Sequence, residues 1–204
     1  MPNKAIFVTG IGTGIGKTIV SAVLVEKLKA DYWKPVQSGD LETSDTLTVK
    51  GLISNSSSVF HPETYRLSQP FSPHKSAAID KVIIDENQFK LPETQNTLIV
   101  EGAGGLMVPL NDGFLIIDLI KKLNTEVILV SQNYLGSINH TLLSIEALQR
   151  RDIPIKGILF NGLKDIYSKE YILNSTGVEL LGHIPEFPLV NKKTIIAAGD
   201  YVDL

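Results

Sequence analysis

The chain has 204 residues, 43% of them hydrophobic, and a formal net charge of −3, which is typical of one globular domain, and we predict a single domain over residues 1–204. The mildly acidic balance disfavours nonspecific nucleic-acid binding, and the absence of cysteine excludes disulfides, thiolate metal sites and a cysteine nucleophile. No apolar run reaches the ~18 residues of a membrane span, and the first residues predict a strand and not a signal peptide, so we expect a cytoplasmic protein without nucleic-acid or membrane partners.

Short apolar runs alternate with helical segments, which predicts an α/β fold with one doubly wound, mostly parallel sheet covered by helices on both faces. The predicted strands are residues 5–9, 32–36, 97–100, 127–130, 155–160 and 178–184. The predicted helices are residues 17–29, 44–53, 115–123 and 138–151. Serines and prolines interrupt the pattern between residues 55 and 96, where we expect either a binding loop or an exposed insertion.

The first predicted strand is followed by the most informative motif of the chain, Gly10-Ile11-Gly12-Thr13-Gly14-Ile15-Gly16-Lys17-Thr18. Glycines let backbone N–H groups approach an anion, and the helix that follows offers unpaired amides and the positive end of its dipole. Lys17 supplies a cation for the outer phosphates, and Thr18 supplies an oxygen ligand for phosphate-bound Mg²⁺. The motif is a longer variant of the Walker A pattern and predicts a P-loop NTPase-like fold. Ile15 disfavours dinucleotide binding, which needs a small residue there.

A carboxylate and a glycine-rich run follow the third predicted strand, as Glu101-Gly102-Ala103-Gly104-Gly105. Ligands of open parallel sheets bind outside the carboxyl ends of the strands. Glu101 is therefore predicted to hold Mg²⁺ near Thr18, as the Walker B acid of nucleotide hydrolases does.

A second lysine, Lys34, comes directly after Tyr32-Trp33 in the second predicted strand. We expect the ammonium groups of Lys17 and Lys34 to converge on one nucleoside triphosphate from adjacent strand ends, since cations fixed in advance stabilise phosphoryl transfer. Asp45 begins the second predicted helix, where either Ser44 or Thr43 is the expected cap. Asp45 itself is either a helix-capping residue or a metal ligand.

These motifs resemble the dethiobiotin synthetase family, in the same order and over nearly the whole chain. The other motifs of the series are Lys34-Pro35-Val36-Gln37-Ser38-Gly39, Ser44-Asp45, Ser72-Pro73-His74, Leu135-Gly136-Ser137-Ile138-Asn139-His140 and Gly182-His183-Ile184-Pro185. The resemblance implies an ATP- and Mg²⁺-dependent cyclo-ligase of biotin biosynthesis. Such an enzyme converts 7,8-diaminononanoate, CO₂ and ATP into the cyclic urea dethiobiotin, ADP and phosphate.

The resemblance also implies a mechanism. A substrate amine captures CO₂ as a carbamate held by Lys34 and Ser38, and a carbamate oxygen attacks the γ-phosphate to give a carbamic–phosphoric anhydride. The second amine then closes the ring and expels phosphate. Lys17 and Lys34 are the expected catalytic residues, and Mg²⁺ is expected to be held by Thr18, Asp45 and Glu101.

The expected binding residues extend beyond these. Nucleotide contacts are expected from Thr13, Gly14, Ile15, Gly16, Lys17, Thr18, Asp45, Glu101, Gly102, Ala103, Gly104, Asn161, Gly162, Pro185, Glu186 and Phe187. Substrate contacts are expected from Ser38, Pro73, Gly136, Ser137, Asn139 and Tyr171. By resemblance the enzyme is a homodimer, and the partner's Gly136 to Asn139 segment, assisted by Tyr171, anchors the substrate carboxylate. An ordinary helix cap explains that segment equally well.

Two positions depart from the family pattern. Gly14 stands where family members often carry an acidic residue, and Gly162 follows Asn161 where they often have aspartate. Asn161 can still bond a purine edge, but the missing carboxylate predicts a looser choice among nucleotides.

Three other classes of protein use a similar phosphate-binding loop. Nucleotide-switch ATPases of the MinD or ParA type, which bind a protein partner, carry another lysine early in the loop, where this chain has Gly12, Thr13 and Gly14. Amidating synthetases of related fold need a cysteine nucleophile, which this chain lacks. A kinase for a small metabolite remains compatible with the loop alone.

Overall fold

The computed structural model describes residues 5–204. The larger sheet consists of β1 (Ala5–Gly10), β2 (Asp31–Trp33), β4 (Phe60–His61), β6 (Leu98–Gly105), β9 (Glu126–Gln132), β10 (Ile155–Asn161) and β11 (Leu180–Ile184). Two short ladders are β3 (Val36–Ser38) with β5 (Tyr65–Leu67), and β7 (Pro109–Asn111) with β8 (Phe114–Leu115). The α-helices are α1 (Lys17–Leu28), α2 (Asp45–Leu52), α3 (Pro73–Asp80), α4 (Ile116–Leu123), α5 (Ser137–Gln149), α6 (Ile166–Thr176) and α7 (Lys192–Ala198). Short 3₁₀ helices lie at Leu41–Thr43, Glu86–Gln88 and Gly199–Tyr201.

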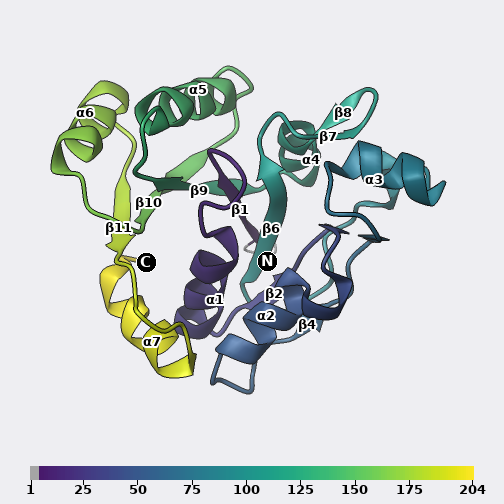
Figure 1. Cartoon of the computed structure of the whole chain (residues 1–204), viewed down its shortest axis with the longest axis horizontal. Coiled ribbons are helices and arrows are strands. Elements are labelled where there is room, and N and C mark those ends of the chain that lie inside the picture. Colours follow the sequence, from purple (N-terminus) through teal and green to yellow (C-terminus); the bar gives the residue numbers. More distant parts are fainter. Residues whose placement is uncertain (1–4) are drawn as a thin grey trace.

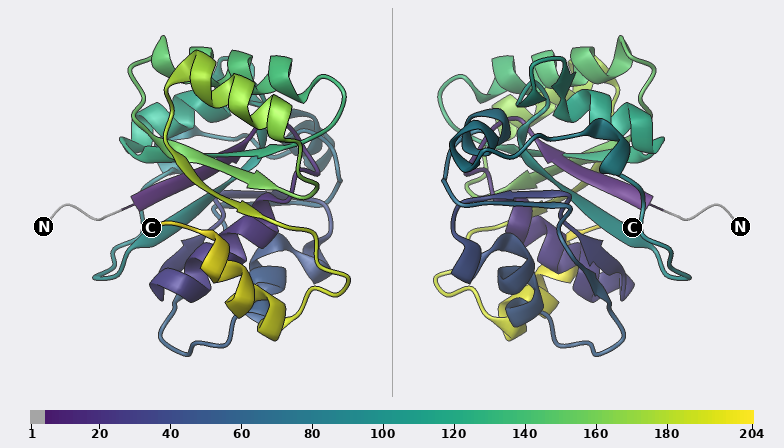
Figure 2. Two further views of the ribbon diagram at one scale, coloured as in Figure 1. Left: turned by 90° about the vertical axis from the view of Figure 1, so that its left-hand side faces the viewer. Right: turned by 90° about the vertical axis from the view of Figure 1, so that its right-hand side faces the viewer.

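The seven strands of the larger sheet lie in the order β11-β10-β9-β1-β6-β2-β4, and each neighbouring pair is parallel. Helices cover both faces. Figures 1 and 2 show α1, α2 and α7 on one face and α4, α5 and α6 on the other. The predicted doubly wound α/β fold is confirmed. Within residues 5–204, no helix combines the length and the apolar character needed to cross a bilayer.

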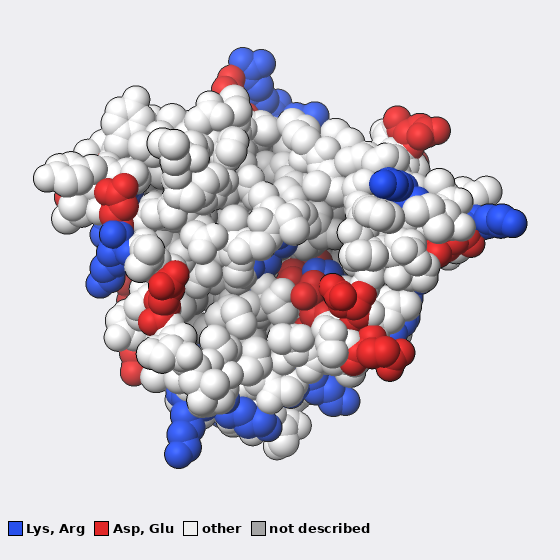
Figure 3. Space-filling model, viewed as in Figure 1, with Lys and Arg blue, Asp and Glu red and all other residues white. Residues whose placement is uncertain are grey.

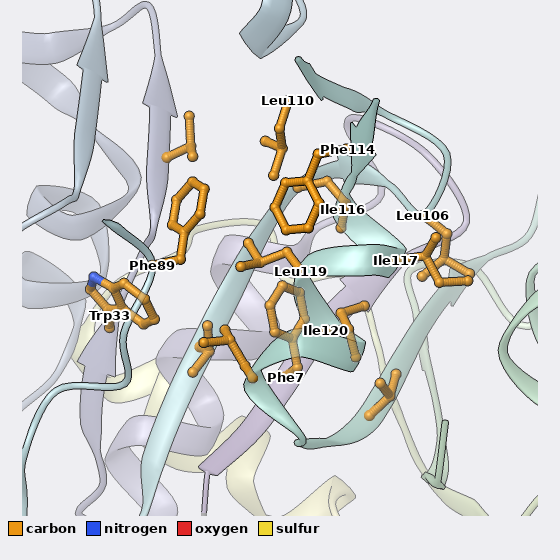
Figure 4. Packing of buried hydrophobic residues seen from close by; sticks show 14 of the residues in the cluster. Phe7, Trp33, Phe89, Leu106, Leu110, Phe114, Ile116, Ile117, Leu119 and Ile120 are labelled. Carbon is orange, nitrogen blue, oxygen red and sulfur yellow. The ribbon is translucent and has the colours of Figure 1, made fainter. Parts of the chain in front are cut away.

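Strand β1 is buried along its whole length because helices cover both of its faces. Phe7 belongs to the hydrophobic cluster that includes Ile116 and Leu119 of α4, as Figure 4 shows. Ile6 and Val8 point to the opposite face and join the cluster of α1. The alternation of side chains along β1 thus ties both helical layers to the strand that leads into the glycine-rich loop.

The second predicted strand is interrupted in the structure at Lys34-Pro35. Pro35 has no N–H to donate to a ladder, and β2 ends at Trp33. The next residues, Val36–Ser38, pair with Tyr65–Leu67 in a separate parallel ladder. The break leaves Lys34 at the carboxyl end of β2.

The segment between α2 and β6 contains ordered elements, β4, β5 and α3. Pro73 stands in the first turn of α3, where a missing N–H costs nothing because that donor has no partner within the helix. The carboxylate of Asp31 fastens both ends of the segment. It accepts hydrogen bonds from Val59 N at 2.8 Å, Thr94 Oγ1 at 2.5 Å and Asn96 Nδ2 at 2.9 Å.

Candidate functional site

The glycine-rich loop between β1 and α1 has the geometry of an anion-binding loop. Gly14 and Gly16 adopt φ of 76° and 89°, in the left-handed region that glycine adopts readily. No side chain of residues 5–204 caps the start of α1. The first amides of the helix therefore remain available to a phosphate.

The end of β10 braces this loop from the side. Asn161 Nδ2 donates to the carbonyl of Ile15 at 3.1 Å. A Cβ on Gly16 would lie 2.1 Å from the same nitrogen, so only glycine fits there. The structure thus brings the predicted residue Asn161 against the loop.

A buried charge cluster lies beside the loop, centred on Glu101, which lies inside β6 because that strand continues to Gly105 and does not end at residue 100 as predicted. Oε1 of Glu101 accepts hydrogen bonds from Thr18 Oγ1 at 3.0 Å and Lys34 Nζ at 3.0 Å, and Oε2 accepts from Tyr32 OH at 2.9 Å. Thr18 Oγ1 also lies 2.9 Å from Asp45 Oδ1, so its single proton is shared between the two carboxylates, and Asp45 forms an ion pair with Lys34. Glu101 is 1% exposed and Lys34 is 4% exposed, so little water reaches these charges. Each charge therefore needs the opposite charge beside it to stabilise it.

The two lysines have opposite pKa shifts. Burial lowers the pKa of Lys17 to about 8, although Glu101 partly offsets it, and Lys17 Nζ donates to the carbonyl of Gly12 at 2.9 Å. Burial also disfavours the charged form of Lys34, but Glu101 and Asp45 outweigh burial and raise its pKa above the usual value. Lys34 thus holds its proton more firmly than Lys17 does.

Lys17 and Lys34 line the same cavity. They do not come from adjacent strand ends, however, because β6 lies between β1 and β2 in the sheet. Glu101 is therefore placed between the two lysines. The position of Glu101 between the lysines follows from the order of strands in the sheet, which the spacing of these residues along the chain does not predict.

The cavity has a volume of about 630 Å³. Figure 3, viewed as in Figure 1, shows basic and acidic side chains together in a recess near the middle of the molecule. The predicted site residues that line it are Thr13, Gly14, Gly16, Lys17, Thr18, Lys34, Ser38, Asp45, Pro73, Glu101, Ala103 and Gly104. The lining also includes Ile19, Val36, Gln37, Asp40, Pro70, Phe71, Ser72 and Val108, which were outside the predicted site set. Of the two interpretations of the irregular segment, the binding loop is favoured, because its residues 70–73 form a wall of this cavity.

Two neighbouring residues of β3, Gln37 and Ser38, line the cavity. Gln37 Oε1 accepts from Asp45 N at 3.2 Å, and Gln37 Nε2 donates to the carbonyl of Gly39 at 2.9 Å, so this side chain ties α2 to the turn after β3. Ser38 Oγ is buried and has no hydrogen-bond partner among the described residues. A buried hydroxyl of this kind is ready to bond a ligand.

A third group of predicted residues lies around the end of β10. A Cβ on Gly162 would lie 3.3 Å from Gln132 Nε2 and 3.7 Å from Glu186 Oε1. Pro185 and Phe187 flank Glu186 in the chain after β11. Gln132 was missed by the sequence analysis, because nothing in its local pattern marks it.

The predicted carboxylate anchor lies outside this cavity. Gly136, with φ of 103°, precedes α5, and no side chain of the described residues caps that helix. Ser137 is 2% exposed, Asn139 is exposed, and Tyr171 on α6 is 57% exposed. The structure therefore does not bring these residues to the lysines of their own chain.

Comparisons with known proteins agree with this architecture. A family model described as an AAA domain matches residues 4–194. A solved structure of the septum site-determining protein MinD with Mg-ADP from Pyrococcus horikoshii OT3 aligns with a TM-score of 0.65 and 16% identity, covering 96% of this chain and 86% of that one. A ParA family ATPase from Chlorobium tepidum TLS aligns with a TM-score of 0.59 and 13% identity, covering 98% of both chains. At such low identity these structures show the fold alone.

Much closer relatives share the sequence. The ATP-dependent dethiobiotin synthetase BioD of Christiangramia forsetii is 51% identical over 94% of this chain and 92% of its own length. The protein of the same name from Cytophaga hutchinsonii is 48% identical over 95% of this chain and 94% of its own length. Because this similarity reaches about half of the residues and extends over more than nine-tenths of both chains, the chain belongs to the ATP-dependent dethiobiotin synthetase family.

Proposed function

We propose that this chain catalyses the ATP-dependent formation of dethiobiotin from 7,8-diaminononanoate and CO₂, a C–N bond-forming ligase reaction of biotin biosynthesis. The observation that carries the proposal is the placement of Lys17 and Lys34 on one cavity with Glu101 between them. Its close relatives bear the name of that activity. We further propose that the chain works in the cytoplasm, where ATP is supplied, and as one carboxylase domain.

The glycine-rich loop is the proposed triphosphate site. Backbone amides from Thr13 to Thr18 would bind the phosphates, because no side chain of the described residues caps the start of α1, and Lys17 would exchange the carbonyl of Gly12 for the γ-phosphate. The base would lie toward Asn161 and Gly162, near the residues that follow β11.

The donor set beside the loop fits Mg²⁺. Thr18 Oγ1 lies within 3.0 Å of carboxylate oxygens of both Asp45 and Glu101, and hydroxyl and carboxylate oxygens are ligands that Mg²⁺ accepts. These three residues would hold the ion. Bound there, it would neutralise charge on the phosphate oxygens.

The opposite wall of the cavity is the proposed diamine site. The unpartnered hydroxyl of Ser38 and the ammonium of Lys34 would bind the carbamate. Val36, Phe71 and Val108 offer apolar surface to the alkyl chain of the substrate, beside Pro73.

The chemistry then needs positioning and fixed charge. A substrate amine adds to CO₂ and loses a proton, giving a carbamate. A carbamate oxygen attacks the γ-phosphorus, and the bond to ADP breaks with its electron pair on ADP. The second amine attacks the carbonyl of the resulting anhydride, phosphate leaves with its electron pair, and the nitrogen loses a proton. Lys17 and Lys34 stabilise the negative charge that gathers between carbamate and phosphate, and no protein nucleophile is required.

We also propose that the enzyme is a homodimer whose partner subunit anchors the substrate carboxylate through Gly136, Ser137 and Asn139, with Tyr171 assisting. The exposure of apolar side chains near these residues supports this, since Leu135 is fully exposed and Tyr167 is 84% exposed. Light scattering should report a mass of two chains, and a strictly monomeric active enzyme would exclude the shared site.

The function is tested by fixing labelled bicarbonate into an acid-stable product. We expect incorporation that requires ATP, Mg²⁺ and 7,8-diaminononanoate together, with release of one phosphate for each label fixed. A purified, folded protein that binds ATP and fixes no label would overturn the proposal. Transfer of the γ-phosphoryl group to a stable phosphorylated product would indicate the kinase alternative.

A further inference from the structure

The carboxylate of Glu101 has one hydrogen-bond donor that does not face the cavity. Tyr32 lies in β2, which pairs with β6 on one side and β4 on the other. Its hydroxyl donates to Oε2 of Glu101 at 2.9 Å, and its side chain is wholly buried, with an exposed fraction of 0%. The ring packs against Phe60 of β4, with 5.7 Å between centroids.

The other two donors to Glu101 differ in kind. Thr18 and Lys34 both donate to Oε1, and both line the cavity. In the proposed function each of these two donors gains a second partner. The hydroxyl of Thr18 would bind the metal ion, and the ammonium of Lys34 would bind the carbamate. Their bonds to Glu101 are therefore exchangeable, whereas the bond from Tyr32 is not exposed to ligands.

Burial makes the loss of a donor costly at this position. The side chain of Glu101 has an exposed fraction of 0%, so water does not replace a hydrogen bond that is lost. Until Mg²⁺ binds, a carboxylate held at one oxygen by exchangeable donors would be free to rotate about its last side-chain torsion, which has a broad energy minimum. The rigid phenol ring, fixed between two strands, prevents that rotation.

We propose that Tyr32 is a positioning residue that holds the Glu101 carboxylate in its catalytic orientation while Lys34 exchanges Glu101 for the reacting substrate. The inference rests on the proposed function of the cavity and assigns a task to a residue that contacts neither nucleotide nor diamine. A phenylalanine would fill the same space beside Phe60, so packing alone does not explain the buried hydroxyl. The hydrogen bond to Glu101 does.

The first test is Tyr32→Phe, which removes one oxygen atom and keeps the ring. We expect kcat to fall about ten- to hundredfold, the range for loss of a buried hydrogen bond to a charged group, with little change in the KM for the diamine. Calorimetry provides a readout other than activity. ATP affinity without Mg²⁺ should match that of the unchanged protein, and the gain in affinity on adding Mg²⁺ should be reduced severalfold.

The matched control is Tyr65→Phe. The Tyr65 hydroxyl accepts from Asp85 N at 2.9 Å and does not line the cavity, so this variant loses a comparable group elsewhere. It should lower the melting temperature without changing kcat or the effect of Mg²⁺ on ATP affinity. If both variants behave alike, or if Tyr32→Phe keeps the unchanged kcat and Mg²⁺ effect, the role of Tyr32 is refuted.

A second measurement needs no variant and covers the case in which Tyr32→Phe does not fold. The hydroxyl proton of Tyr32, followed by NMR of tyrosine-labelled protein, should remain protected from exchange after Mg-ATP and the diamine are added. Loss of that protection would overturn the inference. Failure to fix bicarbonate would overturn the proposed function separately, because the Mg²⁺ effect on ATP binding is measured without the diamine.

Discussion

Lys34 is the cation that two carboxylates share. It bonds Glu101 at 3.0 Å and pairs with Asp45, and these two carboxylates outweigh the effect of burial, raise the pKa of Lys34 and keep its ammonium charged and fixed. A charge held in advance stabilises a developing negative charge without the cost of reorienting solvent. The single residue thus combines a structural role in the free protein with the proposed catalytic role.

Replacing Lys34 with alanine should reduce bicarbonate fixation by at least about a hundredfold, the scale measured for loss of one preorganised electrostatic group. Because Glu101 and Asp45 then lack their cation, the variant should also be less stable, so turnover is measured per folded molecule. The control is Lys156→Ala, which removes a partly exposed ion pair to Glu126 at 3.1 Å and should leave turnover unchanged. A folded Lys34→Ala enzyme of unchanged turnover contradicts the catalytic role.

Lys17 should make ATP binding dependent on pH. Its pKa of about 8 means that the free protein loses this proton as the pH rises through that value, while a bound triphosphate favours the charged form. ATP affinity should therefore stay constant below that pH and fall by up to about tenfold per pH unit above it. Lys34, with its raised pKa, keeps its charge over the same range.

Calorimetry at a series of pH values checks this expectation. Lys17→Arg is the control, because a guanidinium group stays protonated throughout and should remove the dependence even if affinity is lower. An unchanged affinity of the natural protein well above pH 8 would show that Lys17 does not titrate in the free site.

At the scale of residues, the sequence identified the groups that follow apolar runs and missed those that act from inside them. Lys17 and Lys34 stand at a loop end and a strand end, and Glu101, although it lies within β6, directly follows an apolar run where a polar residue is noticeable. Tyr32 lies within an apolar strand and is indistinguishable there from a core aromatic residue. Phe71 reaches the cavity through a long connection whose path local pattern does not determine.

The wall of residues 70–73 depends on the turn that follows β3. Gly39 has φ of +73°, its N–H donates to the carbonyl of Leu67 at 2.8 Å, and a Cβ there would lie 2.6 Å from the Cα of Pro70. Glycine at this position lets the two segments touch. The distance between the wall and Ser38 is set by that contact.

Gly39→Ala should therefore push Pro70 away and raise the KM for the diamine severalfold, with a loss of stability of ~1 kcal/mol or more. Gly51→Ala is the matched control, since nothing lies within 4 Å of its added Cβ and the position is inside α2. That variant should gain roughly 0.5–1 kcal/mol of stability with an unchanged KM. Equal effects of the two substitutions on KM would show that the wall does not bind the diamine.

Among the elements, those with apolar periodicity were predicted and those with polar sequences were not. Helix α4 buries Ile116, Leu119 and Ile120 and is evident in the sequence. Helices α6 and α7 bury little, but their starts carry capping residues, Asp165 and Asn191, whose side chains accept two backbone N–H bonds each. Those caps were the signal that could have located them.

For the whole molecule, the proposed base site would be formed by residues at the end of β10 and after β11. Gly162 has no side chain to select a base, and Gln132 and Glu186 stand around it. One selective hydrogen bond to a base contributes ~1–3 kcal/mol, and Gly162 has no side chain to donate or accept such a bond. We therefore expect turnover with ATP, GTP and CTP to differ by less than about tenfold at matched concentrations. The ratios of kcat/KM measure this directly, and a large preference for ATP would show that another residue reads the base.

The strand order of the sheet was not predictable, although most of its strands were. Local pattern gives the strands and their alternation with helices, whereas the order depends on contacts between residues far apart in the chain. The insertion of β6 between β1 and β2 is such a contact. Because of this contact, Lys17 and Lys34 do not come from adjacent strands as expected, and Glu101 lies between them.

A ribosome releases β1 and β2 well before it releases β6, yet neither of the two early strands borders the other in the finished sheet. A nascent chain that has already released Lys17, Lys34 and Asp45 from the ribosome therefore still lacks β6, the strand that carries Glu101. We therefore expect that nucleotide does not act as a scaffold for the early stages of co-translational folding. Capture of ATP by a stalled chain should begin only after Gly105 has left the exit tunnel.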